Sequence, residues 1–374
     1  MTSPTHSIRT LVQHWGGCTL LSLALSASFL QAAQAQTAPL QGCPSPQILS
    51  RFEEFGRTGK MPPDLGRWLN DRQAQYVEPY QAFDNVYYVG VCWVSAWLVK
   101  TSEGYILIDT LHEPFVDQLI ENMAKVGVKP GDLRYVLMTH GHFDHVGGAY
   151  KLKPLTQARF VMTQTGWDEA IADSQASQKT PRPWQMLSKP DLVVKDGDTI
   201  SLGDTRIKVY ETPGHTHGTA SYSLDVKDGS QTYHAFVIGG LGLNAIDSSR
   251  QVESYIASVN RIDGLVHDQT APITVHLTTH PFSTGLTEAK EKLKTRRPGD
   301  PHPLVDASGF TQQLSTLRQG AEERLVTERM AAGSIAGADA DIAPGVSQRL
   351  GDRRQHPRRA VAGAQAGRRR PDPE

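Results

Sequence analysis

Residues 139–148 read Thr-His-Gly-His-Phe-Asp-His-Val-Gly-Gly, directly after an apolar, strand-like run at residues 135–138. Four side chains of metal-binding type fall within this segment: His140, His142, Asp144 and His145. Imidazole and carboxylate groups suit zinc. A loop that follows a strand lets side chains converge on one point, where binding sites commonly form. A surface cluster of histidines is the alternative, but the buried type of the preceding strand favours a metal site.

Two later segments repeat this arrangement of a strand followed by a histidine-bearing turn. Residues 212–218 read Thr-Pro-Gly-His-Thr-His-Gly and follow a strand pattern at 206–210. Residues 278–281 read Thr-Thr-His-Pro and follow an apolar run at 273–277. Each turn alone is a weak signal, because Pro-Gly-His segments are more often simple turns. Three histidine-bearing turns, each after a strand, are informative together.

The surrounding sequence predicts an α/β protein. Strand patterns rich in β-branched and aromatic residues alternate with helical patterns, which indicates sheets covered by helices. Strands are expected at residues 86–91, 95–99, 105–108, 135–138, 159–163, 192–194, 199–202, 206–210, 235–238 and 273–277. Helices are expected at residues 48–55, 115–126, 252–262 and 311–330.

In their order and spacing, the three histidine segments resemble the metallo-β-lactamase superfamily. The run Gly-Tyr-Ile-Leu-Ile-Asp-Thr at 104–110 also looks like that family's earlier strand, which ends in an aspartate. The resemblance covers about residues 86–290 and implies an αββα sandwich with the metals at one sheet edge. It implies about two zinc ions per chain. The first would be bound by His140, His142 and His215, and the second by Asp144, His145 and His280.

Within that superfamily the chain looks most like the third subclass of class B β-lactamases. Many relatives place a metal-bridging aspartate after a glycine where residues 237–241 here read Val-Ile-Gly-Gly-Leu. The first subclass uses a cysteine ligand in that region, and no cysteine follows Cys92. There are two departures from the third subclass. The third subclass usually carries serines near that strand to hold the substrate carboxylate, whereas the local residues here are Gly240, Gly242 and Asn244, and His217 stands where proline is common.

The resemblance implies a zinc-dependent hydrolase that opens β-lactam rings by attack of a metal-bound hydroxide on a small-molecule substrate. Zinc lowers the pKa of bound water from about 15.7 toward about 7, so hydroxide is available at neutral pH. Asp144 is the expected catalytic residue, because it would ligate the second zinc and orient the nucleophile. Hydrolysis of lactones or other esters remains an alternative. So does a non-catalytic periplasmic zinc-binding protein, because fold alone does not give function.

Several other residues have a structural and a functional interpretation. Asp109 is either a carboxylate that orients a ligating imidazole or a strand-end cap. His217 is expected at the rim of the site. Three further histidines outside the ligand motifs are expected to be structural or exposed: His112, His234 and His276. Three tryptophans are expected in the core or at the rim, with Trp184 able to line a substrate groove: Trp93, Trp97 and Trp184.

Composition and the chain ends complete the expectations. With 38 Lys+Arg against 39 Asp+Glu, the net charge of −1 indicates no steering toward nucleic acid. Residues 1–35 read as a signal peptide, with Arg9, an apolar run at 18–30 and the cleavage-type sequence Ala-Gln-Ala at 33–35. We therefore expect a periplasmic or secreted protein that has no membrane span after the signal peptide is cleaved. Cys43 and Cys92 then face an oxidising compartment, but their spacing leaves pairing open.

The expected domain organisation has three parts after the signal peptide. Residues 36–85 would form an N-terminal extension, and residues 86–332 a metallo-β-lactamase-like domain. Residues 333–374 contain no aromatic residue and few large aliphatic ones. Such a segment cannot bury enough apolar area to offset its ordering entropy, so a disordered tail is expected.

Overall fold

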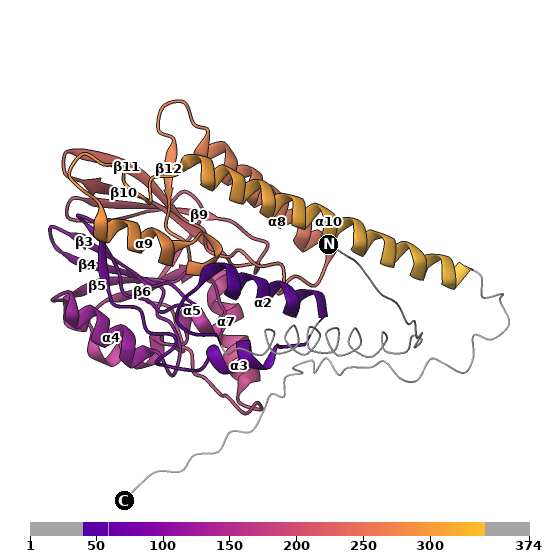
Figure 1. Ribbon diagram of the computed structural model, residues 1–374. Helices are drawn as coiled ribbons and strands as arrows, with labels where there is room; N and C mark the ends of the chain where they lie inside the picture. The colour runs from indigo at the N-terminus through magenta and orange to yellow at the C-terminus, as the bar shows by residue number, and fades with distance from the viewer. Residues whose placement is uncertain (1–39, 59, 341–374) are drawn as a thin grey trace, which may run out of the picture. The chain divides into compact units, whose positions relative to one another are not determined.

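The computed structural model describes residues 40–58 and 60–340 (Figure 1). One compact unit ends at Leu325, and a second unit begins at Val326 and holds the last part of helix α10 (Ala307–Ala340). No helix within the two described ranges combines the length and the apolar character that crossing a membrane requires. The signal peptide expected at residues 1–35 and most of the expected tail lie outside the described residues.

A seven-stranded sheet forms one layer of the first unit. Its order is β1-β2-β3-β4-β5-β6-β7, antiparallel from β1 to β4 and parallel from β4 to β7. Because β4 and β5 are parallel, the segments that follow them lie at the same edge of the sheet. The strands are β1 (Tyr80–Phe83), β2 (Val86–Tyr88), β3 (Trp97–Thr101), β4 (Gly104–Ile108), β5 (Leu133–Leu137), β6 (Arg159–Thr163) and β7 (Leu192–Val194).

A five-stranded sheet of order β12-β11-β10-β9-β8 forms the second layer. Only β11 and β12 are parallel in this sheet, and the other neighbours are antiparallel. Consequently β9, β11 and β12 run in the same direction, and their ends share one edge. The strands are β8 (Thr199–Leu202), β9 (Thr205–Glu211), β10 (Ala220–Asp228), β11 (Gln231–Val237) and β12 (Ile273–His276).

Helices cover the outer face of each sheet, which gives the expected αββα sandwich (Figure 1). The 3-10 turns are η1 (Pro130–Asp132), η2 (Lys153–Leu155) and η3 (Pro281–Ser283). The other helices besides α10 are α2 (Ser45–Thr58), α3 (Pro63–Trp68), α4 (Val116–Lys125), α5 (Phe143–Val146), α6 (Ala149–Leu152), α7 (Gln164–Ser177), α8 (Ser249–Val266) and α9 (Leu286–Thr295). Capping side chains define two helix starts: Thr163 accepts from the Gly166 N–H at α7, and Ser248 from the Gln251 N–H at α8.

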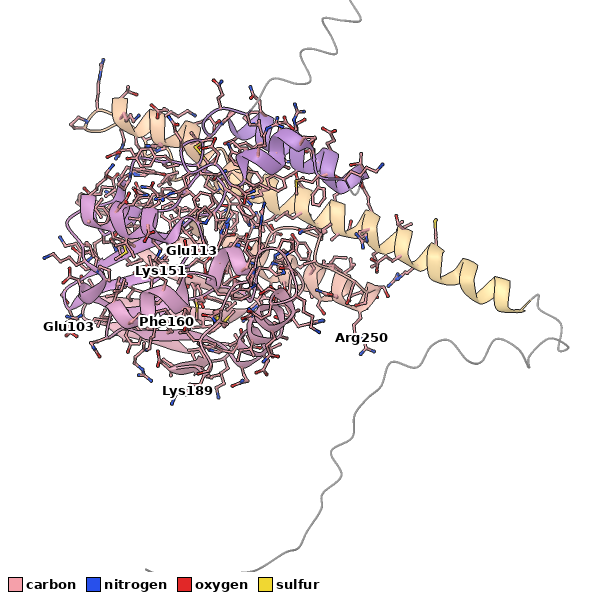
Figure 2. All side chains as sticks on the ribbon, turned by 90° about the horizontal axis from the view of Figure 1, so that it is seen from below. Glu103, Glu113, Lys151, Phe160, Lys189 and Arg250 are labelled. Atoms are coloured by element: carbon pink, nitrogen blue, oxygen red, sulfur yellow. A yellow bond between two sulfur atoms is a disulfide. The ribbon has the colours of Figure 1, made fainter. Side chains whose placement is uncertain are left out.

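Three buried clusters hold these layers together. The central cluster lies between the sheets, where side chains such as Tyr88 and Trp97 meet Tyr222 from the opposite sheet. A second cluster packs α4 and α7 on the seven-stranded sheet, and a third packs α8 and the start of α10 on the five-stranded sheet. Surface ion pairs add little by comparison. An example is Lys151 Nζ, 2.9 Å from Glu113 Oε1 on the outer helical side (Figure 2).

The structure differs from the sequence expectations in three places. Residues 40–85 belong to the first compact unit, and β1 pairs with β2 in the large sheet, so this segment is integrated into the domain. Strand β10 was not expected, although Tyr222, Leu224 and Val226 alternate with polar residues as a half-buried strand does. Helix α10 continues to Ala340, past the boundary expected at residue 332, since the alanine-rich sequence there favours helix.

The open question of the two cysteines is resolved by a disulfide between Cys43 and Cys92, whose Cα atoms are 5.3 Å apart. This bond ties the segment before α2 to the loop between β2 and β3. The Cys92 N–H donates to the Gln75 carbonyl (2.9 Å), and the Trp93 N–H to Gln75 Oε1 (2.9 Å). The disulfide therefore supports a loop that reaches the candidate site described next.

Candidate metal centre

The three histidine-bearing segments meet at one edge of the sandwich. Residues 139–148 follow β5 in the first sheet, residues 212–218 follow β9, and residues 278–281 follow β12 in the second sheet. The Ala220 N–H donates to the Thr139 carbonyl (2.8 Å), which joins the two sheets beside the first segment. Segments that are far apart in sequence thus converge because their strands end at the same edge.

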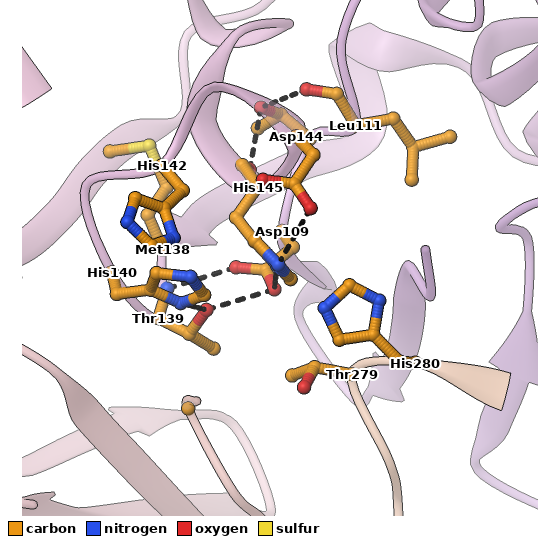
Figure 3. A network of polar contacts seen from close by, with 12 residues as sticks. Asp109, Leu111, Met138, Thr139, His140, His142, Asp144, His145, Thr279 and His280 are labelled. Atoms are coloured by element: carbon orange, nitrogen blue, oxygen red, sulfur yellow. Dashed lines mark hydrogen bonds and ion pairs between the residues drawn. The ribbon is translucent and has the colours of Figure 1, made fainter. Parts of the chain in front are cut away.

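The six candidate ligands form two groups of three. His140, His142 and His215 form one group, and Asp144, His145 and His280 form the other. Within each group the ligand atoms all lie within 4.8 Å of one another. Figure 3 shows Asp144 and His145 with the rings of His140, His142 and His280 around them. The groups adjoin, because the ring centroids of His140 and His145 are 4.1 Å apart.

The spacing within each group fits a tetrahedral zinc ion. His142 Nδ1 lies 3.1 Å from His215 Nε2, and Asp144 Oδ2 lies 3.3 Å from His145 Nε2. Zn–N and Zn–O bonds of about 2.0–2.1 Å at tetrahedral angles place neighbouring ligand atoms about 3.3 Å apart. The groups are therefore spaced as metal ligands, and an oxygen and nitrogen donor set suits zinc.

Hydrogen bonds orient three of the imidazoles through Nδ1. His145 Nδ1 donates to Asp109 Oδ2 (2.8 Å), His215 Nδ1 to the Gly242 carbonyl (2.6 Å), and His280 Nδ1 to the Trp93 carbonyl (2.9 Å). These oxygens only accept, so Nδ1 carries a proton in each ring, and the Nε2 lone pair becomes free to bind a metal whenever the ring is neutral. Ligating histidines in metalloproteins are oriented in this way.

Two nitrogen atoms in the centre lack a hydrogen-bond partner in the described part of the chain, although His145 Nε2 lies 3.3 Å from Asp144 Oδ2. His140 Nε2 and His145 Nε2 are buried and accept or donate no hydrogen bond among the described residues. An unpaired buried polar atom costs about 1–3 kcal/mol. A cation placed between the ligands would provide the missing interaction, so these two atoms support the fit of the donor set to a metal.

Asp109 is the residue that holds the first segment in place. Its Oδ1 accepts from the Thr139 N–H (2.9 Å), and its Oδ2 accepts from Thr139 Oγ1 (3.0 Å) as well as from His145. Asp109 is buried and adopts a φ of 63°, a conformation that non-glycine residues rarely take. Of the two interpretations of Asp109, the structure supports the carboxylate that orients an imidazole (Figure 3).

Burial and neighbouring charges set the protonation of the centre. Burial lowers the pKa of His215 to about 3 and that of His280 to about 4, so both rings are neutral at pH 7. Burial also lowers the pKa of His145, but the adjacent carboxylates of Asp144 and Asp109 outweigh it and raise that pKa to about 10. The position between the two carboxylates thus favours positive charge, as a cation site requires.

The glycines at the end of β11 shape the wall beside His215. A Cβ atom on Gly240 would lie 2.5 Å from His215 Cβ and Cδ2, which is too close for any side chain. Gly242 supplies the carbonyl that orients His215. The departure from serine noted in the sequence therefore has a structural reason at Gly240. The sequence alone did not reveal this role, because it depends on a contact with a distant segment.

Glu169 on α7 is a supporting residue that sequence reasoning missed. Its carboxylate accepts from the His217 N–H (2.8 Å) and from the Gly218 N–H (2.9 Å). These bonds hold the turn that carries His215. His217 itself has an exposed side chain and belongs to neither ligand group, in agreement with the expected rim position.

The remaining histidines and tryptophans also lie outside the two groups. His234 is paired with Asp225 at the surface, and His276 is buried, bonded to Gln313 and stacked on Phe310. The buried side chain of His112 packs beside Trp93, which brings it closer to the centre than its sequence position suggested. Trp97 is in the core, and Trp184 is half-buried with its indole N–H directed at Asp173.

Comparisons with known proteins agree with this geometry. Residues 89–228 match the family model of the metallo-beta-lactamase superfamily. A hydroxyacylglutathione hydrolase of Francisella tularensis subsp. holarctica is 27% identical over 180 residues, covering 46% of this chain and 64% of that protein. An uncharacterized protein of Aquifex aeolicus is 38% identical over 122 residues, covering 32% of this chain and 53% of that protein. The chain thus spans less than two thirds of the length of these curated relatives.

Two solved structures extend the comparison to the whole sandwich. BJP-1, a subclass B3 metallo-beta-lactamase of Bradyrhizobium japonicum, is 28% identical and covers 69% of this chain and 97% of its own, with a TM-score of 0.61. FEZ-1, the metallo-beta-lactamase of Legionella gormanii, is 24% identical and has a TM-score of 0.62. The match covers 68% of this chain and 98% of the FEZ-1 chain. The second likeness concerns the fold alone.

Proposed function

We propose that this chain, which carries a metallo-β-lactamase superfamily domain over residues 89–228, is a zinc-dependent hydrolase that opens β-lactam rings. The observation that carries the proposal is the pair of three-residue groups at one edge of the sandwich. Their side chains are spaced and hydrogen-bonded as metal ligands. The similarity to the subclass B3 enzyme of Bradyrhizobium japonicum supports β-lactams as the substrate class.

We propose two zinc sites per chain, one for each group. His140, His142 and His215 would hold the first ion, and Asp144, His145 and His280 the second. When bound, zinc lowers the pKa of a coordinated water to about 7 and polarises a carbonyl oxygen.

The residues of the chain would perform two tasks in the reaction. Thr139, Asp109 and the Gly242 and Trp93 carbonyls hold the imidazoles in position. Asp144, the acid among the six ligands, would accept a hydrogen bond from the attacking water and orient it. The water oxygen then bonds to the lactam carbonyl carbon, the C–N bond breaks, and the ring nitrogen receives the proton that the water gives up. No covalent bond to the protein is needed.

Hydrolysis of a thioester or another ester is the second candidate function. The named curated relatives are hydroxyacylglutathione hydrolases, which supports this alternative. The residues after β11 count against thioester hydrolysis, because Gly239 and Gly240 stand where such hydrolases carry a metal-bridging aspartate. The His215 ring occupies the space that a side chain on Gly240 would need. The geometry therefore favours the β-lactam over the thioester.

We also propose export to the periplasm or the cell exterior. The expected signal peptide lies outside the described residues, so the support within them is the Cys43–Cys92 disulfide. Disulfides persist in oxidising compartments and are rare in the cytosol. Mass spectrometry of the exported protein is expected to show an N-terminus after Ala35, and an intact Met1 would contradict it.

The activity is tested with zinc-loaded, full-length protein and a chromogenic cephalosporin. Hydrolysis is expected, with loss on chelation and recovery on adding zinc. The variant Asp144→Asn should keep its fold but lose most of the turnover. If zinc-loaded protein opens no β-lactam but hydrolyses lactones or thioesters, the β-lactam proposal is wrong and the metallohydrolase remains. If it turns over no carbonyl substrate, the non-catalytic zinc-binding alternative holds.

A further inference from the structure

Three aromatic side chains form a contiguous set beside the centre: Trp93, His112 and Phe143, called here the aromatic row. The ring centroids of Trp93 and His112 are 5.1 Å apart, and those of His112 and Phe143 are 4.9 Å apart. His112 meets both neighbours edge to face, at interplanar angles of 83° and 84°. The ring centroids of Trp93 and Phe143 are 6.0 Å apart. These geometries are typical of stable aromatic packing.

The aromatic row borders the ligand group of Asp144, His145 and His280. Phe143 stands in the chain between His142 and Asp144, one ligand from each group. The Trp93 carbonyl accepts from His280 Nδ1, and the Trp93 ring lies 6.5 Å from the His280 ring. Phe143 is 39% exposed, although a large apolar side chain is normally buried. The aromatic row therefore offers a partly exposed ring whose two neighbours in the chain are candidate ligands.

The aromatic row contains no ionisable side chain other than the imidazole of His112. His112 Nδ1 is buried and makes no hydrogen bond within the described part of the chain. On the β11 side of the centre, Gly240 has no room for a side chain. Side-chain selectivity cannot come from that position. The aromatic row offers side-chain surface next to the ligand group that contains His280, and this surface is suited to an apolar, planar group.

We propose that the aromatic row binds an aromatic group of the substrate and thereby selects among the substrates of the centre. The proposal rests on the hydrolase function proposed above for the choice of substrates, but not for the binding itself. An aromatic ring stacked on Phe143 or Trp93 would replace water on an apolar face and gain the geometry-dependent attraction between rings. The preferred substrate class is therefore a strained amide whose acyl side group carries a phenyl ring.

The kinetic experiment compares two penicillins that differ only in this ring. Benzylpenicillin carries a phenylacetyl side group, and 6-acetamidopenicillanic acid carries an acetyl group on the same nucleus. Wild-type, zinc-loaded protein is expected to show a kcat/KM about tenfold higher for benzylpenicillin, the effect of one stacking contact. The difference should lie mainly in KM, because the ring binds away from the reacting bond.

Variants of Phe143 assign the preference to the aromatic row. Phe143→Ala is expected to bring the ratio of the two kcat/KM values close to one, and Phe143→Tyr to preserve it. Tyr150→Ala is the matched control, because Tyr150 is an exposed aromatic residue on α6 outside the aromatic row. Zinc content is measured for each variant first, so that a change of ratio is not confused with loss of metal.

A binding experiment tests the aromatic row without turnover. Ligand-observed NMR compares 2-phenylacetamide with acetamide on wild type, Phe143→Ala and Tyr150→Ala. Contact with the phenyl ring is expected in wild type and Tyr150→Ala, and its loss in Phe143→Ala. Equal kcat/KM values for the two penicillins in wild type, or an unchanged phenyl contact in Phe143→Ala, would overturn the inference. If no penicillin is opened, the β-lactam proposal fails, and the NMR result alone decides the role of the aromatic row.

Discussion

At the scale of single residues, the centre depends on groups that orient the candidate ligands. Three Nδ1 atoms are committed to Asp109, Gly242 and Trp93, so that the opposite nitrogen of each ring faces the metal position. Rotation of an imidazole by a few tens of degrees would misdirect its lone pair. The partners of the ligands are thus as necessary as the ligands, as in other metal sites.

Removing the Asp109 charge tests this dependence. Asp109→Asn keeps the side-chain size but weakens the bond to His145 Nδ1 and the bonds from Thr139. Zinc affinity at the Asp144, His145 and His280 group is expected to fall about 10- to 100-fold. Competition with a chromophoric chelator measures it. Asp117→Asn is the control, because Asp117 is an exposed residue of α4 that pairs with Lys151. The zinc affinity of this variant should equal that of the wild type. Equal affinities in all three proteins would contradict the assigned role.

Adding a side chain at Gly240 tests the wall beside His215. Gly240→Ser would restore the serine common in the third subclass, but its Cβ would collide with the His215 ring. The ring must then turn, so zinc affinity at the His140, His142 and His215 group should fall at least about tenfold. Gly131→Ser is the control, because nothing lies within 4 Å of a Cβ there. A Gly240→Ser protein with both zinc sites intact would show that the collision is relieved without cost to His215.

At the scale of elements, the loop between β2 and β3 links the disulfide to the centre. Cys92 is bonded to Cys43, and the next residue, Trp93, supplies the carbonyl that orients His280. The loop is also held by the Ser95 N–H, which donates to the Thr279 carbonyl beside His280 (2.9 Å). The disulfide and the loop that it restrains therefore help to fix the positions of His280 and of its neighbour Thr279.

Loss of the disulfide should affect both stability and one metal site. Cys43 and Cys92 are 49 residues apart. A disulfide that closes a loop of that length lowers the conformational entropy of the unfolded chain and so raises the free energy of unfolding by about 4 kcal/mol. A Cys43→Ser/Cys92→Ser variant is expected to lose about that much free energy of unfolding, measured by denaturant titration. Zinc affinity should decline at the group that contains His280 more than at the other. If the variant and the wild type had the same denaturant midpoint, the unfolded chain would already be compact without the disulfide.

At the scale of the whole molecule, the centre joins the two sheets. Ligands come from both layers, since the segments after β5 and those after β9 and β12 contribute to it. A metal bound there stabilises the folded chain, in which the ligands converge, over the unfolded chain, in which they do not. The buried Nε2 atoms without partners also become satisfied.

Removal of the metal should therefore lower the melting temperature. An ion present at 100 times its dissociation constant stabilises the folded state by about 2.7 kcal/mol for each site. Scanning calorimetry of chelated and zinc-reconstituted protein is expected to differ by several degrees, and magnesium should not replace zinc, because it prefers oxygen ligands. Identical transitions with and without zinc would argue against metal binding by the folded state.

The positions of most strands and of the candidate ligands could be predicted from the sequence, because both signals are local. Four ligand-type residues stand within residues 139–148, and the strand patterns before the three turns are short and apolar. Strand β10 was missed although its residues alternate, and residues 36–85 were expected as an N-terminal extension. The apolar residues of both segments are buried against distant parts of the chain in the central cluster, and the sequence does not show these contacts.

The internal order of the centre was set by the tertiary fold. Nothing in the sequence indicates that the Gly242 carbonyl faces His215, that Trp93 lies against His112, or that Cys43 meets Cys92. These contacts arise because strands of two sheets end at the same edge and bring distant loops together. Hydrogen bonds and packing act over a few ångströms, whereas sequence spacing constrains only near neighbours. Local chemistry thus identified the type of ligand, the family resemblance implied the division into two groups, and convergence of the strand ends brings the members of each group together.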